Sequence, residues 1–204
     1  MQRVERRQAK AIGSLKILEE LSHQLRSAAL GMSSIPLAGQ DEEIGANELL
    51  GRHDEALAQV QQVYLVDPLA VDSRTEALWI YFFSGRMEET VAQARKTIEL
   101  EPGAGSAHAI LALAYSQMGR RRETVEAAET AARVSDAPGK IVVAVSALAR
   151  VGERDKAEKL LDRALEMAKS IYVCRFLLAA AYTDLGEKEK ALESLERGAR
   201  EKST

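Results

Sequence analysis

The sequence predicts an all-α protein built as a solenoid of stacked antiparallel helix pairs. Three observations predict it. Glycines recur at intervals of 33 or 34 residues, each in a phrase where an apolar helical run gives way to charged residues: Gly51, Gly85, Gly119, Gly152 and Gly186. The chain of 204 residues is 46% apolar but only 4% aromatic, so its core must be packed mainly with Ala, Leu and Val. The four prolines all fall outside the predicted helices: Pro36, Pro68, Pro102 and Pro138. A proline inside a helix would cost about 3 kcal/mol, so their placement supports the predicted helix boundaries.

The first element, residues 1–36, is expected to be an N-terminal amphipathic helix, either a degenerate leading repeat or a cap. From about residue 2 to 30, apolar side chains recur at helical spacing. They form one stripe: Leu15, Ile17, Leu18, Leu21, Leu25 and Ala29.

The second element, residues 37–202, is expected to be an array of five helix pairs. We draw its units at 37–70, 71–104, 105–138, 138–171 and 172–202. The first unit has the weakest pattern, since it has few apolar anchors and an internal glycine, Gly45. The last helix, from Glu187 to Lys202, suits an end cap because it is apolar along one stripe only: Ala191, Leu192, Leu195 and Ala199.

Each glycine phrase predicts the turn inside a helix pair. Glycine ends the first helix, because it adopts the positive φ of a helix C-terminus without steric cost. Acidic residues such as Glu88 and Glu89 then open the second helix, where the helix dipole favours negative charge. Five residues after each glycine comes a small residue that lets the two helices approach closely: Ala56, Thr90, Thr124, Ala157 and Ala191.

These features resemble the tetratricopeptide repeat family. The clearest copy, residues 105–138, matches the family pattern at His108, Leu111, Ala112, Tyr115, Gly119, Thr124, Ala128 and Ala131. It departs from the pattern at His108, where the family has Trp, and at Thr124, where the family has Ala. The resemblance implies a right-handed superhelix of helix pairs. The closing portion, residues 171–199, also looks like the closing repeats of bacterial signalling and regulatory proteins.

The resemblance also implies a binding groove, because in this family the first helices of the units line a concave face. The corresponding places hold mainly apolar residues here: Trp79, Phe82, Phe83, Ile110, Leu113, Val142, Val143, Phe176 and Leu177, with Gln117, Arg150 and Asp184 as polar members. An apolar peptide or an amphipathic helix fits this lining. Some members of the family bind the carboxylate of a chaperone tail with Lys, Asn and Arg side chains on this face. That binding mode does not fit this chain, because the corresponding positions hold Asp41, Gly45 and apolar residues.

Three interpretations of this apolar face remain open. The first is that the face is core, covered by the chain's own helix 2–30 or by a twin subunit. The second is that an external protein partner binds it. The third is that the repeat register is mistaken.

No enzymatic constellation is found. His23, His53 and His108 are scattered, without Cys, Asp or Glu at metal-ligand spacing, and His108 fills a packing position. A Gly-rich phosphate loop, a nucleophile elbow and a Cys–His pair are all missing from the sequence. We therefore expect no catalytic residue, no cofactor and no metal site.

Charge and composition exclude several partners. The net charge of −3 gives no basic footprint for nucleic acid, and the basic run Arg120–Arg122 is interpreted as a solvated turn. Cys174 is the single cysteine, so no internal disulfide is expected, and we interpret it as a buried, inert thiol. No stretch approaches the roughly 18 apolar residues of a membrane span. A cytoplasmic location is expected.

The favoured function is a non-catalytic protein–protein interaction module that binds an apolar peptide or helix in its groove. An alternative is a regulatory or accessory repeat region of a larger signalling protein or enzyme. Direct RNA binding by the helical solenoid is a third class, and it predicts strongly salt-dependent retention on RNA.

Overall fold

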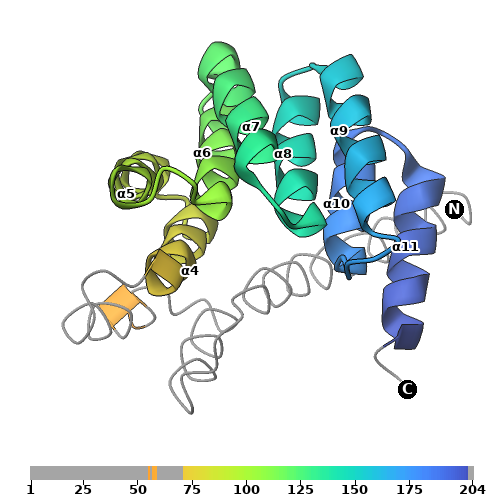
Figure 1. The fold of residues 1–204 in the computed structure, drawn as a ribbon. Helices are drawn as coiled ribbons and strands as arrows, with labels where there is room; N and C mark the ends of the chain where they lie inside the picture. Colours follow the sequence, from red (N-terminus) through yellow and green to blue (C-terminus); the bar gives the residue numbers. More distant parts are fainter. Residues whose placement is uncertain (1–54, 56, 59–70, 202–204) are drawn as a thin grey trace, which may run out of the picture.

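The computed structural model describes residues 55, 57, 58 and 71–201, and this part of the chain contains eight helices and no strand (Figure 1). The helices are α4 (Val71–Phe83), α5 (Met87–Leu100), α6 (Gly105–Gln117), α7 (Arg121–Val134), α8 (Pro138–Arg150), α9 (Arg154–Met167), α10 (Arg175–Asp184) and α11 (Lys188–Glu201). The predicted N-terminal helix, most of the unit 37–70 and the turn at Gly51 lie outside the described residues. The all-α prediction is confirmed.

The helices are paired in chain order, and the pairs are stacked. α4 packs on α5, α6 on α7, α8 on α9 and α10 on α11. Each first helix also packs on the first helix of the next pair, so α4, α6, α8 and α10 follow one another through the stack (Figure 1). Such nearest-neighbour contacts define a helical solenoid. The right-handedness of the superhelix stays a prediction.

The turn inside each described pair has the same hydrogen bonds. At Gly119, with φ of 70°, the glycine N–H donates to Ser116 O over 3.2 Å. The next N–H, of Arg120, donates to Tyr115 O over 2.9 Å. These two bonds are the Schellman motif, which satisfies the last carbonyls of a helix. The same pair of bonds recurs, at φ of 78° to 80°, at Gly85, Gly152 and Gly186.

The turn glycines predict a stability effect that depends on the backbone alone. A Cβ added at Gly119 meets nothing within 4 Å, so Gly119→Ala introduces no clash. It does place an L-residue in the left-handed region, and we expect the free energy of unfolding to fall by about 1–2 kcal/mol in urea titrations. Gly103→Ala is the matched control, because Gly103 has the same open space and lacks a positive φ. Equal losses in the two variants would contradict this account.

The small residues after the four described turn glycines lie at the crossing of the two helices. Thr90, Thr124 and Ala157 are completely buried, and Ala191 is 6% exposed. The two threonines are at the position where the family pattern has Ala. The hydroxyl of each donates a hydrogen bond to a backbone carbonyl of the preceding turn. Thr90 Oγ1 donates to Arg86 O, and Thr124 Oγ1 donates to Arg120 O, both over 2.8 Å. The buried polar group is therefore satisfied, and the crossing stays close.

One apolar cluster extends through the described pairs from α4 to α10, and alanine is its commonest residue. Its completely buried large side chains include Ile110, Ile141 and Leu148. Among the described residues, no helix is long and apolar enough to cross a membrane.

Three local details differ from the sequence-based expectation. Pro138 is the first residue of α8 rather than lying outside it, a position where the missing N–H costs nothing. Cys174 is half-buried rather than buried and packs against the core just before α10. Leu192, part of the predicted stripe of the last helix, is 56% exposed.

Candidate functional site

The first helices of the four described pairs together line a small apolar hollow. α4, α6, α8 and α10 each contribute side chains, and the second helices contribute none. The hollow has a volume of about 70 Å³. Its lining is Trp79, Phe82, Phe83, Leu113, Val142, Val143, Ser146, Arg150, Leu177 and Ala180.

The aromatic wall of the hollow comes from α4. Because Trp79, Phe82 and Phe83 are spaced i, i+3 and i+4, one face of the helix presents all three. The rings of Trp79 and Phe83 stack, with their centroids 5.5 Å apart and their planes 18° apart. Phe82 meets both other rings edge to face. These geometries are the favoured ones for aromatic pairs, so the three rings form one preorganised surface.

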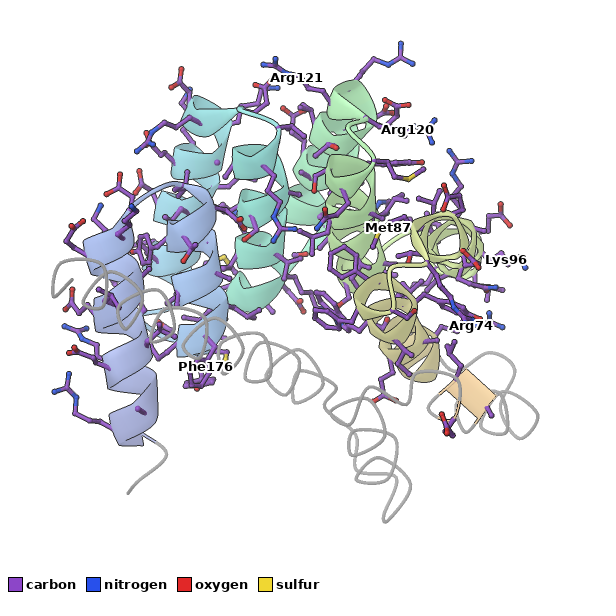
Figure 2. The ribbon with its side chains drawn as sticks, turned by 180° about the vertical axis from the view of Figure 1, so that it is seen from behind. Arg74, Met87, Lys96, Arg120, Arg121 and Phe176 are labelled. Carbon is purple, nitrogen blue, oxygen red and sulfur yellow. The ribbon has the colours of Figure 1, made fainter. Side chains whose placement is uncertain are left out.

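Seven of the nine predicted groove residues line the hollow, and two do not. Ile110 is completely buried in the core. Phe176 packs instead against α11, where a Cβ added at Gly198 would lie 3.4 Å from its ring. It lies at the first turn of α10, toward the opposite edge of the helix stack from Arg120 and Arg121 (Figure 2). The structure therefore places Ile110 and Phe176 in packing positions outside the hollow.

The seven residues that line the hollow are less open than a bare groove would be. Trp79, Phe82, Leu113, Val142, Val143 and Leu177 are each 8% exposed or less. Phe83 is half-buried. A bound ligand would therefore bury little additional surface of each lining side chain. Its affinity would depend on shape complementarity and on contacts at the rim of the hollow.

The rim has a polar end made by an ion pair between successive units. Arg150 Nε lies 3.1 Å from Asp184 Oδ1, and the two side chains are 33% and 18% exposed. The second carboxylate oxygen, Asp184 Oδ2, is buried and has no hydrogen-bond partner. An acceptor of this kind is costly to leave unmatched, so it marks a place where a donor would be stabilised.

Two lining residues, Ser146 and Ala180, were not among the predicted groove residues. The repeat period could have identified them. Trp79, Leu113, Ser146 and Ala180 lie 34, 33 and 34 residues apart, so they occupy the same place in four successive units. This repeat position was predicted to line the groove in the units where it holds a large apolar side chain, and it was missed in the units where it holds a small one.

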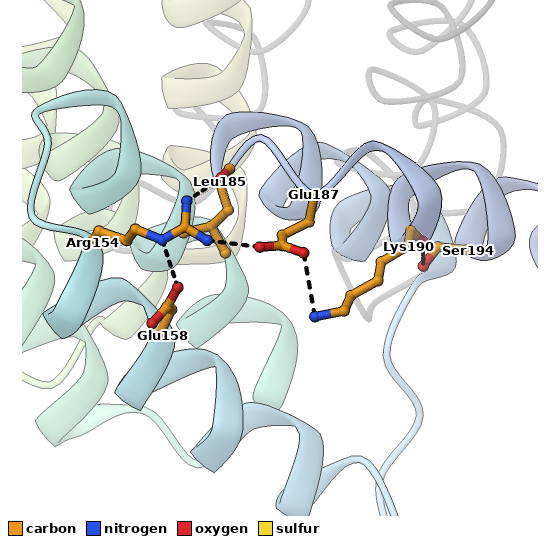
Figure 3. Close-up of polar contacts among 6 residues, drawn as sticks. All are labelled: Arg154, Glu158, Leu185, Glu187, Lys190 and Ser194. Atoms are coloured by element: carbon orange, nitrogen blue, oxygen red, sulfur yellow. Dashed lines mark hydrogen bonds and ion pairs between the residues drawn. The ribbon is translucent and has the colours of Figure 1, made fainter.

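The second helices carry charged side chains that join one unit to the next. Arg154, at the start of α9, donates to Leu185 O over 2.7 Å and to Glu187 Oε1 over 2.6 Å (Figure 3). It also pairs with Glu158, and Glu187 pairs in turn with Lys190. The hydrogen bond from Arg154, with Lys190 nearby, holds the pKa of Glu187 below its ordinary value. These groups fasten the turn of the last pair to the pair before it.

The predicted basic run is engaged with carboxylates of the chain itself. Arg120 lies 3.0 Å from Glu123 and sits over the ring of Tyr115, with 5.0 Å to its centroid. Arg121 pairs with Glu153 of the next unit over 2.8 Å. The open hollow beside this run is lined by both signs of charge, including Arg122, Arg133, Glu126 and Glu129.

The histidines show no metal-binding arrangement in the region that the structure describes. No group of three or more His, Cys, Asp or Glu side chains could hold a metal ion there. His108 is half-buried, and its Nε2 lies 3.0 Å from Pro102 O. His23 and His53 lie outside the described residues.

Comparison with known proteins gives one family match. Residues 173–202, which contain α10 and α11, match the model of the tetratricopeptide repeat. Among solved structures, the chain is similar to a crystal structure of TPR-like repeats from a putative kinesin light chain of Podosopora anserina, at 20% identity and a TM-score of 0.49. That similarity covers 79% of this chain and 92% of the other. No curated protein matches the chain.

Proposed function

We propose that this chain, whose closing unit is a tetratricopeptide repeat, is a non-catalytic module that holds an apolar side chain of a partner peptide or helix in the hollow. The family match confirms the predicted repeat in that unit, and repeats of this family are protein–protein interaction modules. The observation that supports the proposal is that four first helices, and no second helix, converge on one apolar hollow with an aromatic wall.

The size of the hollow favours part of a protein over a small molecule. Sites for small molecules usually enclose roughly 300–1,000 Å³. The hollow has about 70 Å³, and one end of its rim is an ion pair. It therefore suits one or two side chains of a larger partner that lies across the first helices. The cytoplasmic location expected from the sequence stays a prediction.

Ala180→Arg tests the proposal with little risk to the fold. Ala180 lines the hollow and is half-buried, so an arginine there places a long charged side chain in the hollow from its rim. We expect the affinity for a captured partner to fall about tenfold or more, measured with purified proteins after affinity capture. Thr183→Arg is the matched control, because Thr183 is exposed on the same helix and does not line the hollow.

A second variant tests the aromatic wall. Trp79→Ala combined with Phe83→Ala removes the stacked pair, and the same partner should be lost while the cooperative unfolding transition remains. Partners retained equally by wild type and Ala180→Arg would contradict the proposal. Recovery of the chain's own copies alone would assign the hollow to self-association and also contradict it.

A further inference from the structure

We propose that the cleft between α5 and α7 is a second binding site, which receives an arginine side chain presented by a partner protein. The cleft has a volume of about 440 Å³, which lies within the range of roughly 300–1,000 Å³ that ligand sites occupy. None of the residues that line it also lines the hollow. The inference therefore does not depend on the proposed function.

The walls of the cleft are two second helices, and its floor is the first helix between them. α5 and α7 both pack on α6 and lie on either side of it (Figure 1). The cleft is lined by Ile98 of α5, which is half-buried, and by Leu111 of α6 and Ala127 of α7, which are each 7% exposed. Together they offer an apolar surface for the aliphatic stem of a long cationic side chain.

The open charges of the cleft are two carboxylates on opposite walls. Glu99 of α5 and Glu126 of α7 both line the cleft and are exposed. Within the described part of the chain, neither makes a hydrogen bond or an ion pair. The other charged groups are engaged, since Glu123 pairs with the arginine three residues before it and Arg95 Nη2 donates to Tyr115 Oη over 2.8 Å. The cleft is therefore left with negative charge that favours a cation.

The next junction of the same array shows which cation fits. Between α7 and α9, Arg163 Nη1 donates to Ala132 O over 2.8 Å. Ile98 lies 13 residues after its turn glycine, as Ala132 does. Thr130 lies 11 residues after its turn glycine, as Arg163 does, and it lines the cleft. The position that holds a guanidinium at one junction thus holds only a short hydroxyl side chain at the junction before it.

A backbone carbonyl in the wall of the cleft favours arginine over lysine. Ile98 O lies in the last turn of α5, where carbonyls lack partners inside the helix. The residue four places further on is Pro102, which has no N–H to donate. A guanidinium has five N–H donors in a planar fork, so it can bond a carbonyl and a carboxylate at once, whereas an ammonium is a point charge.

The capped peptide Ala-Arg-Ala tests the proposal against two analogues. Titrated into the purified chain labelled with ¹⁵N, it should shift the amide NMR signals of residues that line the cleft, in a saturable way. Ala-Lys-Ala should bind less tightly. Ala-citrulline-Ala has nearly the same shape without the charge, and it should cause no saturable shift.

Removal of the two open carboxylates should weaken this binding. For Glu99→Gln combined with Glu126→Gln, we expect the affinity for the arginine peptide to fall about tenfold or more, because each charge-assisted hydrogen bond is lost. The matched control is Glu88→Gln combined with Glu89→Gln. It removes the same charge from exposed positions of α5 that do not line the cleft, and it should bind like wild type.

Thr130→Arg gives the cleft a guanidinium of the chain's own, as Arg163 does at the next junction. It should abolish the shifts caused by the arginine peptide, because the place is then filled. Thr183→Arg, exposed and outside the cleft, adds the same charge and should leave the binding unchanged. Ala180→Arg, in the hollow, should also leave it unchanged, which separates the two sites.

Three results would each overturn the arginine site: no saturable shift with the arginine peptide, equal binding of the citrulline peptide, or full binding by the Glu99→Gln, Glu126→Gln chain. Loss of the shifts in Ala180→Arg would place the peptide in the hollow and would overturn it as well. If Thr130→Arg fails to fold, the glutamine variant decides. A folded Thr130→Arg that still binds the peptide would contradict the assigned place of the guanidinium.

Discussion

We expect Leu148→Ala to lower the free energy of unfolding by about 2–5 kcal/mol, enough to unfold a marginally stable array. Leu148 is completely buried in α8, which packs on α6, α7, α9 and α10. Truncation removes the apolar burial of the side chain and leaves a cavity that four surrounding helices cannot all close. Urea denaturation followed by circular dichroism measures the loss as a lower midpoint.

Leu192→Ala is the matched control for this prediction, because it removes the same atoms from a side chain that is 56% exposed. Its effect should stay within about 0.5 kcal/mol. If the two variants lost similar stability, or if Leu148→Ala lost none, then α8 would not be the centre of the core. A lower midpoint at Leu148 without a change in the denaturant slope would indicate that the array still unfolds as one unit.

The glycine turns could be predicted from the sequence because the signal is local. A positive φ at a helix end favours glycine over other residues, so the spacing of Gly85, Gly119, Gly152 and Gly186 marks the observed turns. The small residues at the helix crossings were predictable for the same reason, since each lies five residues beyond its glycine. The 33- or 34-residue repeat is therefore sufficient to predict the helix pairs without any long-range contact.

The orientation of individual first-helix side chains was less predictable, because it depends on where each helix begins. α10 begins at Arg175 and has 10 residues, whereas α4, α6 and α8 have 13. Phe176 is therefore only the second residue of its helix, and it packs toward Gly198 instead of lining the hollow. The sequence signal for this packing was Gly198, which lies inside the predicted last helix. A glycine within a helix often marks a position where another element packs closely against it.

Partners of charged side chains could not be assigned from the sequence either. Arg150 and Asp184 occupy equivalent places in successive units, so the period brings them near each other. Whether they bond to each other, to a neighbouring turn or to water depends on rotamers that long flexible side chains do not fix. In the structure, Arg150 forms an ion pair with Asp184, and Arg154 forms ion pairs with Glu187 and Glu158.

We expect Ala157→Leu to lower the free energy of unfolding by about 1–3 kcal/mol, whereas Ala157→Thr should be nearly neutral. Ala157 is completely buried where α9 crosses α8, and the added leucine atoms force the two helices apart. Threonine occupies this same place in two earlier units, at Thr90 and Thr124, with its hydroxyl bonded to the carbonyl four residues back.

The corresponding carbonyl for Ala157→Thr is Glu153 O, which already accepts the N–H of Ala157 over 3.0 Å, just as Arg120 O accepts the N–H of Thr124 over 2.9 Å. The hydroxyl is therefore satisfied without movement of the backbone, and the branched side chain has the size that other crossings accommodate. Urea midpoints for wild type, Ala157→Thr and Ala157→Leu, measured together, separate the two effects. A large loss for threonine would show that the crossings are not equivalent, and no loss for leucine would show that close approach is not what the repeated small residue provides.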